Sequence, residues 1–344
     1  MNIVVDMHHP GDVHLFKHLI KELEGRGHRL LITTTDKDVT VPLLNDYGYR
    51  FKFLGSTGQS LFRKALSIPV LDYKFYQAVK DFKPDLCIGH GSIRVSHIAK
   101  LLGVKSFLMV DTEASIKEHI MYMPFADVIA SPNCYRRKFR KNQHVHYPGY
   151  HELAYLHPNR FHPEPRVLDQ LGIRKGEDIF VVRFIAWGAT HDIGQHGFTL
   201  EGKRKLIKTL SERGRVFITS EKTLEDEFKK YSFPLSPTKL HDVLAFSTIH
   251  VGEGATIASE AAALGIPVVF VSTLVHGYLQ ELEEKYGLIY TTANEQAALQ
   301  RIEDLLSMPD LKEQWQEKRE RLLNDKVDVT QWMLDFIERS FKWQ

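Results

Sequence analysis

The sequence contains few cysteines and no long apolar segment. Only Cys87 and Cys134 among its 344 residues carry a thiol, which is too few for a disulfide framework and is typical of a reducing compartment. No apolar run reaches the roughly 20 residues of a membrane-spanning helix. The chain begins with an apolar strand and shows no signal-peptide pattern. We therefore expect a cytoplasmic protein.

Neither sign of charge is in excess. The sequence has 45 Lys and Arg residues against 43 Asp and Glu residues, a formal net charge of +2, so no general surface for polyanions is expected. No motif that reads nucleic acid occurs, and we expect no nucleic-acid partner. A hydrophobic fraction of 43% with 26% charged residues is typical of a globular protein. A length of 344 residues suggests two domains.

Two common ligand motifs are also missing. A dinucleotide fold needs a G-x-G-x-x-G turn after its first strand, whereas HHPGDVHLF at residues 8–16 offers only Gly11, which argues against NAD. The 18 histidines include no H-E-x-x-H pattern and no Cys-rich spacing, and their dense groupings are His8–His9 and His144-x-His146. Such groupings are usually turn or surface residues. We expect no bound metal and no cofactor.

Strands alternate with helices along the chain, a pattern typical of parallel sheets covered on both faces. We expect an α/β fold with two Rossmann-like, doubly wound parallel-sheet domains at 1–150 and 166–327, joined by a proline-rich stretch at 148–166. The expected strands are 3–6, 29–35, 50–54, 85–89, 106–110, 128–130, 179–183, 215–219 and 268–271. The expected helices are 13–26, 39–47, 60–81, 94–102, 200–212, 240–245, 295–307, 311–323 and 329–341.

The segment IHVGEGATIASEAAALGIPVVFV at residues 249–271 has the order strand, glycine turn, helix and second buried strand. Gly252 and Gly254 let the backbone turn sharply and let an anion approach. A helix that begins near Ala255 presents unpaired N–H groups and the positive end of its dipole. Thr256 adds a hydroxyl. This arrangement predicts a site for a nucleoside diphosphate.

Glu260 lies in the same expected helix, four residues after Thr256. Both side chains then share one helix face, about 6 Å apart along the axis. This matches the offset between a diphosphate and its ribose, so the carboxylate can accept two ribose hydroxyls. Gly265 and Pro267 are expected to end the helix. The alternative is an ordinary strand–helix–strand unit with a solvated glutamate.

Titratable side chains gather in two loops that follow expected strands, where catalytic residues of parallel sheets lie. The first loop carries His8, His9, Asp12 and His14. A neutral imidazole there can remove a proton from an acceptor hydroxyl, and Asp12 can orient it. We assign catalysis to His14 and Asp12. The alternative is that Asp12 only caps a helix and that the histidines are turn residues.

The second loop, FIAWGATHDIGQHGF at residues 184–198, follows Arg183 and contains His191 and Asp192. A hydrogen-bond donor there can stabilise the diphosphate that leaves when a sugar is transferred. We assign Arg183 to donor binding, and His191 and Asp192 to catalysis. The alternative is a flexible lid with no chemistry of its own.

These motifs resemble those of GT-B nucleotide-sugar enzymes. GDVHLFKHLIKELEGRGHRLLITT (residues 11–34) looks like their opening, and residues 252–271 look like their donor-binding unit. The second match is strongest for the N-acetylglucosaminyltransferase that makes lipid II and for the non-hydrolysing UDP-N-acetylglucosamine 2-epimerase. As a whole, the chain is similar to an uncharacterised GT-B-like family with HPGDVHxF near the start and WxAxHD in the middle, here Trp187–Asp192.

The resemblance implies a donor bound in a cleft between the domains and held mainly by the second. Gly254, Ala255 and Thr256 would then contact phosphate, and Glu260 the ribose. His14 matches the histidine that follows the first glycine turn of the transferases. GT-B enzymes generally work without a metal. Their last helix crosses back onto the first domain, which we expect here for 328–344.

We expect a glycosyltransferase that moves a sugar from a nucleoside-diphosphate donor, in particular a UDP-sugar, to a hydroxyl acceptor in surface-glycan or glycoconjugate synthesis. The basic stretch 135–142 and the apolar, basic stretch 61–77 suit contact with the inner face of an anionic membrane that carries a lipid-linked acceptor. The alternative is that both stretches are ordinary solvated surface.

Two other functions stay open. PDLCIGHGSIRVSHIAKLLGVKSFLMVDTEAS (residues 84–115) resembles the central segment of the epimerase, with Glu113, Glu118 and His191 near the expected places. However, Ser92 stands where that enzyme has an aspartate, and HHPGD lacks its arginine. The other alternative is a non-catalytic nucleotide-sugar binding protein, although binding alone does not require titratable side chains in both domains.

Overall fold

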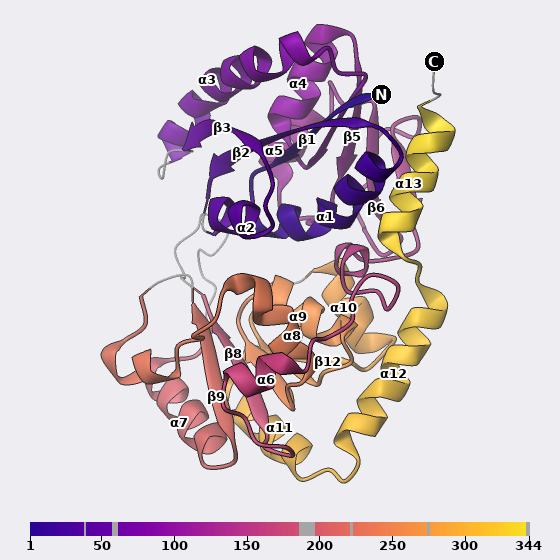
Figure 1. Cartoon of the computed structure of the whole chain (residues 1–344). Helices are drawn as coiled ribbons and strands as arrows, with labels where there is room; N and C mark the ends of the chain where they lie inside the picture. The colour runs from indigo at the N-terminus through magenta and orange to yellow at the C-terminus, as the bar shows by residue number, and fades with distance from the viewer. Residues whose placement is uncertain (38, 57–60, 186–196, 221–222, 274–275, 342–344) are drawn as a thin grey trace. The chain divides into compact units, whose positions relative to one another are not determined.

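The structure is a computed structural model that describes the chain except for residues 38, 57–60, 186–196, 221–222, 274–275 and 342–344 (Figure 1). The described residues form two compact units. The first unit consists of Met1–Arg160 together with Lys326–Gln344, and the second unit consists of Phe161–Asp325. Each unit is built on one parallel sheet.

The first unit contains a seven-stranded sheet with the order β3-β2-β1-β4-β5-β6-β7, and all its pairings are parallel. The strands are β1 Asn2–Met7, β2 Arg29–Asp36, β3 Phe51–Ser56, β4 Leu86–His90, β5 Lys105–Met109, β6 Val128–Pro132 and β7 His144–Tyr147. β1 and β4 pair at the centre and are buried along nearly their whole length, which is why both read as short apolar runs.

Helices pack against this sheet and against one another. They are α1 Pro10–Gly25, α2 Thr40–Asp46, α3 Leu61–Val79, α4 Ile93–Leu102, α5 Ile116–Tyr122 and α13 Val329–Ser340, with 3₁₀ turns η1 Lys80–Phe82 and η2 His151–Ala154. The C-terminal helix α13 contacts α1 and η2 (Figure 1). Met333 and Ile337 of α13 are fully buried, and the Thr330 hydroxyl donates to the Ala154 carbonyl at 2.7 Å.

The second unit contains a five-stranded parallel sheet with the order β12-β11-β10-β8-β9. The strands are β8 Ile179–Phe184, β9 Arg215–Ser220, β10 Ile249–Gly252, β11 Val268–Val271 and β12 Ile289–Thr292. The helices are α6 Arg166–Gln170, α7 Leu200–Ser211, α8 Leu240–Ala245, α9 Ala255–Ala263, α10 Gly277–Glu284, α11 Glu295–Leu306 and α12 Leu311–Asp325, with 3₁₀ turns η3 Asp226–Tyr231 and η4 Pro237–Lys239.

Helix α9 ends where the sequence predicts. Gly265 adopts a positive φ of 75°, a conformation that favours glycine at the end of a helix. Its N–H donates to Ala262, and the N–H of Ile266 reaches back to Ala261. β11 then begins at Val268, directly after Pro267. No described helix is long and apolar enough to cross a membrane.

The C-terminal ends of the strands determine where polar side chains gather. Because every strand of a parallel sheet runs in the same direction, these ends lie along one edge of the sheet. At this edge of the first unit, His8 follows β1, His90 ends β4 and Asp111 follows β5. At the same edge of the second unit, Arg183 lies near the end of β8 and Gly252 ends β10.

Candidate functional site

Asp12 lies in the first turn of α1, shortly after β1. Its Oδ2 atom accepts hydrogen bonds from the backbone N–H groups of His8 and His9, at 2.8 and 3.0 Å. The Nδ1 atom of His9 accepts from the N–H of Gly11 at 3.1 Å, so His9 and Asp12 form a reciprocal capping box. The capping role that the sequence left open for Asp12 is therefore present.

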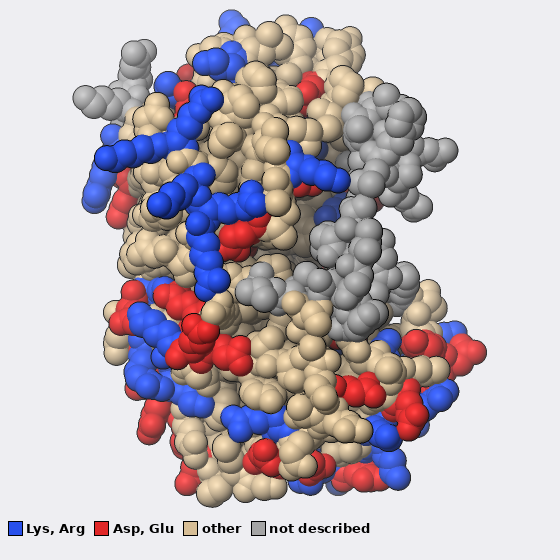
Figure 2. All heavy atoms as spheres, turned by 180° about the vertical axis from the view of Figure 1, so that it is seen from behind, with Lys and Arg blue, Asp and Glu red and all other residues tan. Residues whose placement is uncertain are grey.

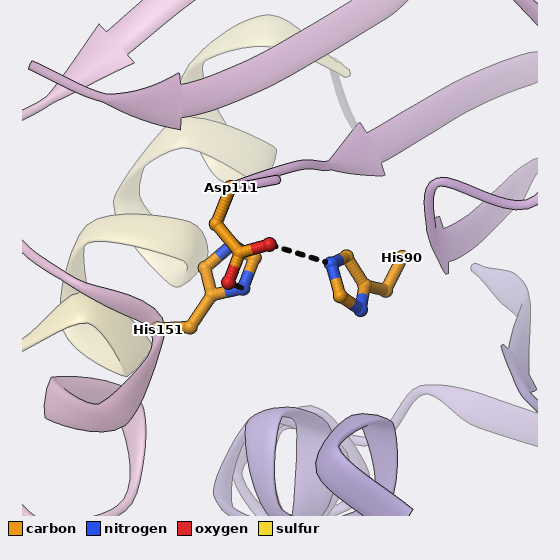
Figure 3. A group of neighbouring side chains, drawn as sticks. All are labelled: His90, Asp111 and His151. Carbon is orange, nitrogen blue, oxygen red and sulfur yellow. Dashed lines mark hydrogen bonds and ion pairs between the residues drawn. The ribbon is translucent and has the colours of Figure 1, made fainter. Parts of the chain in front are cut away.

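Asp12 also begins a chain of alternating carboxylates and imidazoles. Its Oδ1 atom lies 2.8 Å from His90 Nδ1, and His90 Nε2 lies 3.4 Å from Asp111 Oδ1. The other oxygen of Asp111 lies 3.0 Å from His151 Nδ1 (Figure 3). We call these four residues the Asp–His chain. They come from α1, the end of β4, the loop after β5 and η2.

The charges of the Asp–His chain follow from its contacts. Burial alone would lower the pKa of His90, but hydrogen bonds to Asp111 and Asp12 raise this pKa to about 10. Burial alone would raise the pKa of Asp111, but His151 and His90 hold it well below its ordinary range. At neutral pH, His90 is therefore a cation between two carboxylates, and it can donate a proton but not accept one.

His8 has the opposite character. Its Nδ1 atom lies 3.2 Å from Asp12 Oδ2, and its side chain is 33% exposed. Burial lowers the pKa of His8, so the imidazole is neutral at pH 7. Burial also lowers the pKa of His9, to about 4, but the ring of His9 is engaged in the helix cap. His8 is thus a neutral, partly exposed imidazole beside an ionised carboxylate, as a general base requires.

His14, the base assigned from the sequence, occupies a different environment. It is 8% exposed. Its ring stacks on Tyr155 at 5.4 Å between ring centroids and meets Tyr47 edge-on at 6.1 Å. The structure therefore places Asp12 in the Asp–His chain and His14 in an aromatic cluster. The catalytic role of His14 stays a prediction.

A second buried carboxylate, Asp6, lies near the end of β1. It accepts hydrogen bonds from the hydroxyls of Thr33 and Ser92 at 2.8 and 2.7 Å, and from Arg94 Nε at 3.0 Å. Ser92 stands where the epimerase resemblance would place an aspartate. Its hydroxyl instead bonds to this carboxylate from the neighbouring strand and caps α4 through the N–H of Val95.

The carboxylate that joins the Asp–His chain from the loop after β5 is Asp111. From the sequence, Glu113 and Glu118 are the acidic residues expected in this region by the resemblance to the epimerase. Glu113 accepts a hydrogen bond from the backbone of Arg136 at 3.3 Å, and Glu118 is exposed on α5. His90 and Asp111 were not predicted. Each lies at or just after the end of an apolar strand, and this position is the signal by which the sequence could have pointed to them.

In the second unit, the N-cap residue of α9 is Gly254, which has no side chain to cap the helix. The N–H groups of its first turn, which includes Ala255 and Thr256, have no partner within the helix. Arg183 packs against both glycines. A Cβ atom on Gly254 would lie 3.2 Å from Arg183 Cγ, and one on Gly252 would lie 3.0 Å from Arg183 Cβ. The glycines thus let a guanidinium side chain lie at a helix N-terminus.

Glu260 is 3% exposed, which excludes the alternative of a solvated glutamate. Its Oε1 atom lies 3.0 Å from Nε2 of His241 on α8, and both side chains are buried. A buried carboxylate next to an imidazole is held in a fixed orientation. Its contact with a ribose stays a prediction.

Glu253 connects the glycine turn to the second predicted loop. This residue is buried, and its carboxylate accepts hydrogen bonds from the backbone N–H groups of Ile185 at 3.0 Å and Phe198 at 2.7 Å. The predicted catalytic residues His191 and Asp192 lie between these two positions, outside the residues that the structure describes.

Solved structures with similar folds cover nearly the whole chain. S. aureus MnaA in complex with UDP has a TM-score of 0.71 at 14% identity, covering 98% of this chain and 96% of its own. The UDP-GlcNAc 2-epimerase of Neisseria meningitidis bound to UDP-GlcNAc has a TM-score of 0.66 at 12% identity, covering 99% and 100%. The glycosyltransferase VinC in complex with dTDP has a TM-score of 0.64 at 12% identity, covering 99% and 100%.

These similarities and the two parallel sheets confirm the predicted class, a GT-B-like fold with two Rossmann-like domains. They also confirm the resemblance to UDP-N-acetylglucosamine 2-epimerases and GT-B glycosyltransferases. The model of the family described as "Protein of unknown function (DUF354)" matches residues 1–329, so the chain belongs to that family. The uncharacterized protein MJ0665 of Methanocaldococcus jannaschii is 24% identical over 279 residues, covering 78% of this chain and 81% of its own.

Proposed function

We propose that this protein is a glycosyltransferase that moves the sugar of a UDP-sugar to a hydroxyl acceptor. The observation that carries the proposal is the separation of two kinds of site. The second unit has a helix N-terminus with an arginine and a buried glutamate. The first unit has a neutral imidazole beside an ionised carboxylate. Transfer requires both, a donor site and a base for the acceptor.

The second unit supplies the donor site. The first-turn N–H groups of α9 and the guanidinium of Arg183 both favour a diphosphate. Glu260, held by His241 at 3.0 Å, is the acceptor for the ribose hydroxyls. Support comes from the similar solved structures, in which MnaA holds UDP and the N. meningitidis epimerase holds UDP-GlcNAc. His191 and Asp192 are proposed to stabilise the diphosphate as it leaves.

The first unit supplies the base. We assign this role to His8, because its imidazole is neutral and partly exposed, and because the Asp12 carboxylate stabilises the imidazolium that forms when a hydroxyl proton is removed. His90 cannot take this role, since its pKa of about 10 keeps it protonated at neutral pH. His14 remains the alternative base that the sequence suggests.

The surface of the first unit suits an anionic acceptor. Figure 2 shows Lys and Arg side chains gathered on one face of this unit. In the basic stretch 135–142, the rings of Tyr135 and Phe139 stack with 5.8 Å between their centroids. The exposed side chains of this stretch include Arg136, Lys138 and Arg140. The apolar residues thus anchor the segment, and the cations face outwards. An acceptor linked to an anionic lipid matches this chemistry.

One observation favours a second candidate, a 2-epimerase of nucleotide sugars. Asp12 lies between a neutral imidazole, His8, and a protonated one, His90. Moving a proton from one face of a sugar to the other requires one acid and one base, and this pair offers both.

Product analysis separates the two functions. UDP-, GDP-, CDP- and dTDP-sugars would be screened by thermal shift, and the stabilising donor would be incubated with hydroxyl acceptors, free or in anionic vesicles. Transfer predicts nucleotide release that depends on the acceptor. A C2 epimer formed by the donor alone, seen by NMR with no acceptor modified, would establish the epimerase instead. The absence of any binding would contradict both.

A further inference from the structure

We propose that His90, Asp111 and His151 bind one divalent transition-metal ion. One ligand atom from each residue lies within 4.8 Å of the other two. His90 Nε2 is 3.4 Å from Asp111 Oδ1, and His151 Nδ1 is 3.0 Å from Asp111 Oδ2 (Figure 3). Ligands about 2.1 Å from a tetrahedral ion are about 3.4 Å apart. The separation of His90 and Asp111 matches that of two ligands of one ion, and His151 lies against the other oxygen of the same carboxylate.

The ligands are held in orientation by neighbouring side chains. Asp12 Oδ1 lies 2.8 Å from His90 Nδ1, which leaves Nε2 of the same ring directed at Asp111. A carboxylate behind a histidine ligand is the usual way in which proteins fix the tautomer and the direction of that ligand. The Thr112 hydroxyl donates to Asp111 Oδ1 at 2.8 Å. Two of the three ligands are thus oriented by contacts outside the set.

His151 is held in a fixed orientation by its neighbours. Its side chain is buried, and its Nε2 atom has no hydrogen-bond partner among the described residues. The ring is fixed by parallel stacking on Tyr147 at 6.2 Å and by an edge contact with His90 at 4.8 Å. Buried imidazole nitrogens normally have a partner. The unpartnered atom is Nε2, whereas the atom that faces Asp111 is Nδ1, so the two ring contacts fix the direction of the ligand atom.

The ligand set selects the class of ion. Two imidazoles and one carboxylate favour Zn²⁺, Co²⁺, Fe²⁺ or Mn²⁺, whereas Mg²⁺ and Ca²⁺ prefer sites made of oxygen atoms. Asp12 and Asp111 together carry two negative charges, which balance the two positive charges of such an ion. An ion bound by His90 Nε2 takes the place of the proton that this ring otherwise carries between the two carboxylates.

An ion held by three protein ligands keeps at least one position open. An oxygen bound there has its pKa lowered by the metal. If the proposed transfer is correct, this oxygen is the acceptor hydroxyl, and the ion assists its deprotonation. This role depends on the proposed function, whereas the binding of the ion does not.

Metal titration tests the site directly. The full chain would be treated with a chelator and then titrated with Zn²⁺ against a chromophoric chelator, and with Co²⁺ by visible absorption. We expect one equivalent to bind and His151→Gln and Asp111→Asn to weaken binding by roughly 100-fold or more. His97→Gln is the matched control, since His97 pairs with Asp72 at 2.8 Å in the same unit but lies outside the proposed set. His146→Gln is the second control, because it asks whether the neighbouring histidines His144 and His146 bind the ion instead.

The outcomes are distinct. Loss of binding in both ligand variants, with retention in both controls, supports the site. No binding by the wild-type chain, retained binding in the ligand variants, or loss in the controls overturns it. Circular dichroism checks each fold, and His90→Asn replaces any ligand variant that does not fold. Because no nucleotide sugar is present, this result is independent of whether transfer or epimerisation is later found.

Discussion

Asp12 uses both of its carboxylate oxygens. One oxygen caps α1 through two backbone N–H groups and faces His8, and the other contacts His90. Substitution of Asp12 therefore removes a helix cap, typically worth about 1 kcal/mol of stability, in addition to any effect on the reaction rate. His8 and His90 are better probes, because each side chain can be changed without removing the cap.

We predict that His8→Ala lowers kcat for sugar transfer by roughly 10²–10⁴-fold, which is the usual contribution of a general base. The dissociation constant of the donor should be unchanged, because the residues assigned to the donor lie in the second unit. Steady-state kinetics and calorimetric titration would measure both quantities. His14→Ala is the comparison, and a large fall in kcat for that variant with none for His8→Ala would assign the base to His14.

Glu260→Gln should weaken binding of the nucleotide sugar by roughly 1–3 kcal/mol, since charge-assisted hydrogen bonds to the ribose are lost. The amide is chosen because alanine would leave the buried His241 without its carboxylate partner and destabilise the unit. Calorimetry with the stabilising donor measures the effect. Glu283→Gln is the control, as this carboxylate accepts from the backbone of Thr291. Equal affinities for all three proteins would exclude the role.

The charge of His90 predicts a dependence of stability on pH. Its pKa is about 10 in the folded protein and 6.5 without the fold. The folded state thus binds more protons between these values, and stability falls as pH rises through this window. The contribution of His90 is complete below pH 6.5 and lost above about 10. Urea unfolding of the chelator-treated protein from pH 6.5 to 10 should show a shallower decline for His90→Gln. Parallel curves would contradict the assigned charge.

At the scale of elements, long apolar or periodic segments were predictable. The helix at 240–245 and the strand at 268–271 match the structure residue for residue. Helix α1 begins at Pro10, three residues before the predicted start, because the capping box at His9 was not predicted. β7 and β12 were missed. Both are edge strands of four residues, too short to show a period.

Because β7 was not predicted, His151 was not recognised as a site residue. His151 lies four residues after the end of β7, so without that strand nothing placed it at the edge of the sheet. His90, Asp111 and His151 are also far apart in sequence, whereas metal motifs are recognised by local spacing. The absence of a local metal-binding motif was the reason to expect no metal. Such motifs cannot reveal a group of ligands that comes from the ends of distant strands.

Glu253 gives a prediction about an element boundary. Its two hydrogen bonds join the end of β8 to the N-terminal side of α7 through Ile185 and Phe198. Glu253→Gln replaces one acceptor oxygen by an NH₂ group, which faces a backbone N–H and cannot bond it. We expect a loss of about 1–3 kcal/mol in the free energy of unfolding, measured in urea. Glu201→Gln, an exposed residue of α7, should have little effect.

At the scale of the whole molecule, the first unit is made of two separate stretches of chain. Arg160, the last residue of the first stretch, bonds to Asp328 at 2.6 Å and to Glu22 at 2.7 Å. The N–H of Val327 donates to the carbonyl of Pro148 at 2.9 Å. The places where the chain leaves and re-enters this unit are therefore tied together, and α13 completes its core.

Removal of residues 328–344 should expose the apolar surface of the first unit and lower its melting temperature. Met333→Ala is the milder test. It leaves a cavity at a fully buried position and should cost about 2–5 kcal/mol. Arg339→Ala, exposed on the same helix, should change stability by less than about 0.5 kcal/mol. Calorimetry would measure all three proteins. A truncated chain with an unchanged transition would contradict the role of α13.

The split first unit also reverses the usual order of events on the ribosome. Domains generally fold as they emerge, with the N-terminal one first. Here the second unit is a single stretch that is complete once Asp325 has been added, whereas the first unit still lacks α13 at that point. The ribosome therefore releases all the residues of the second unit before it releases all those of the first. The seven strands of the first unit are therefore synthesised well before α13, the helix that completes its core.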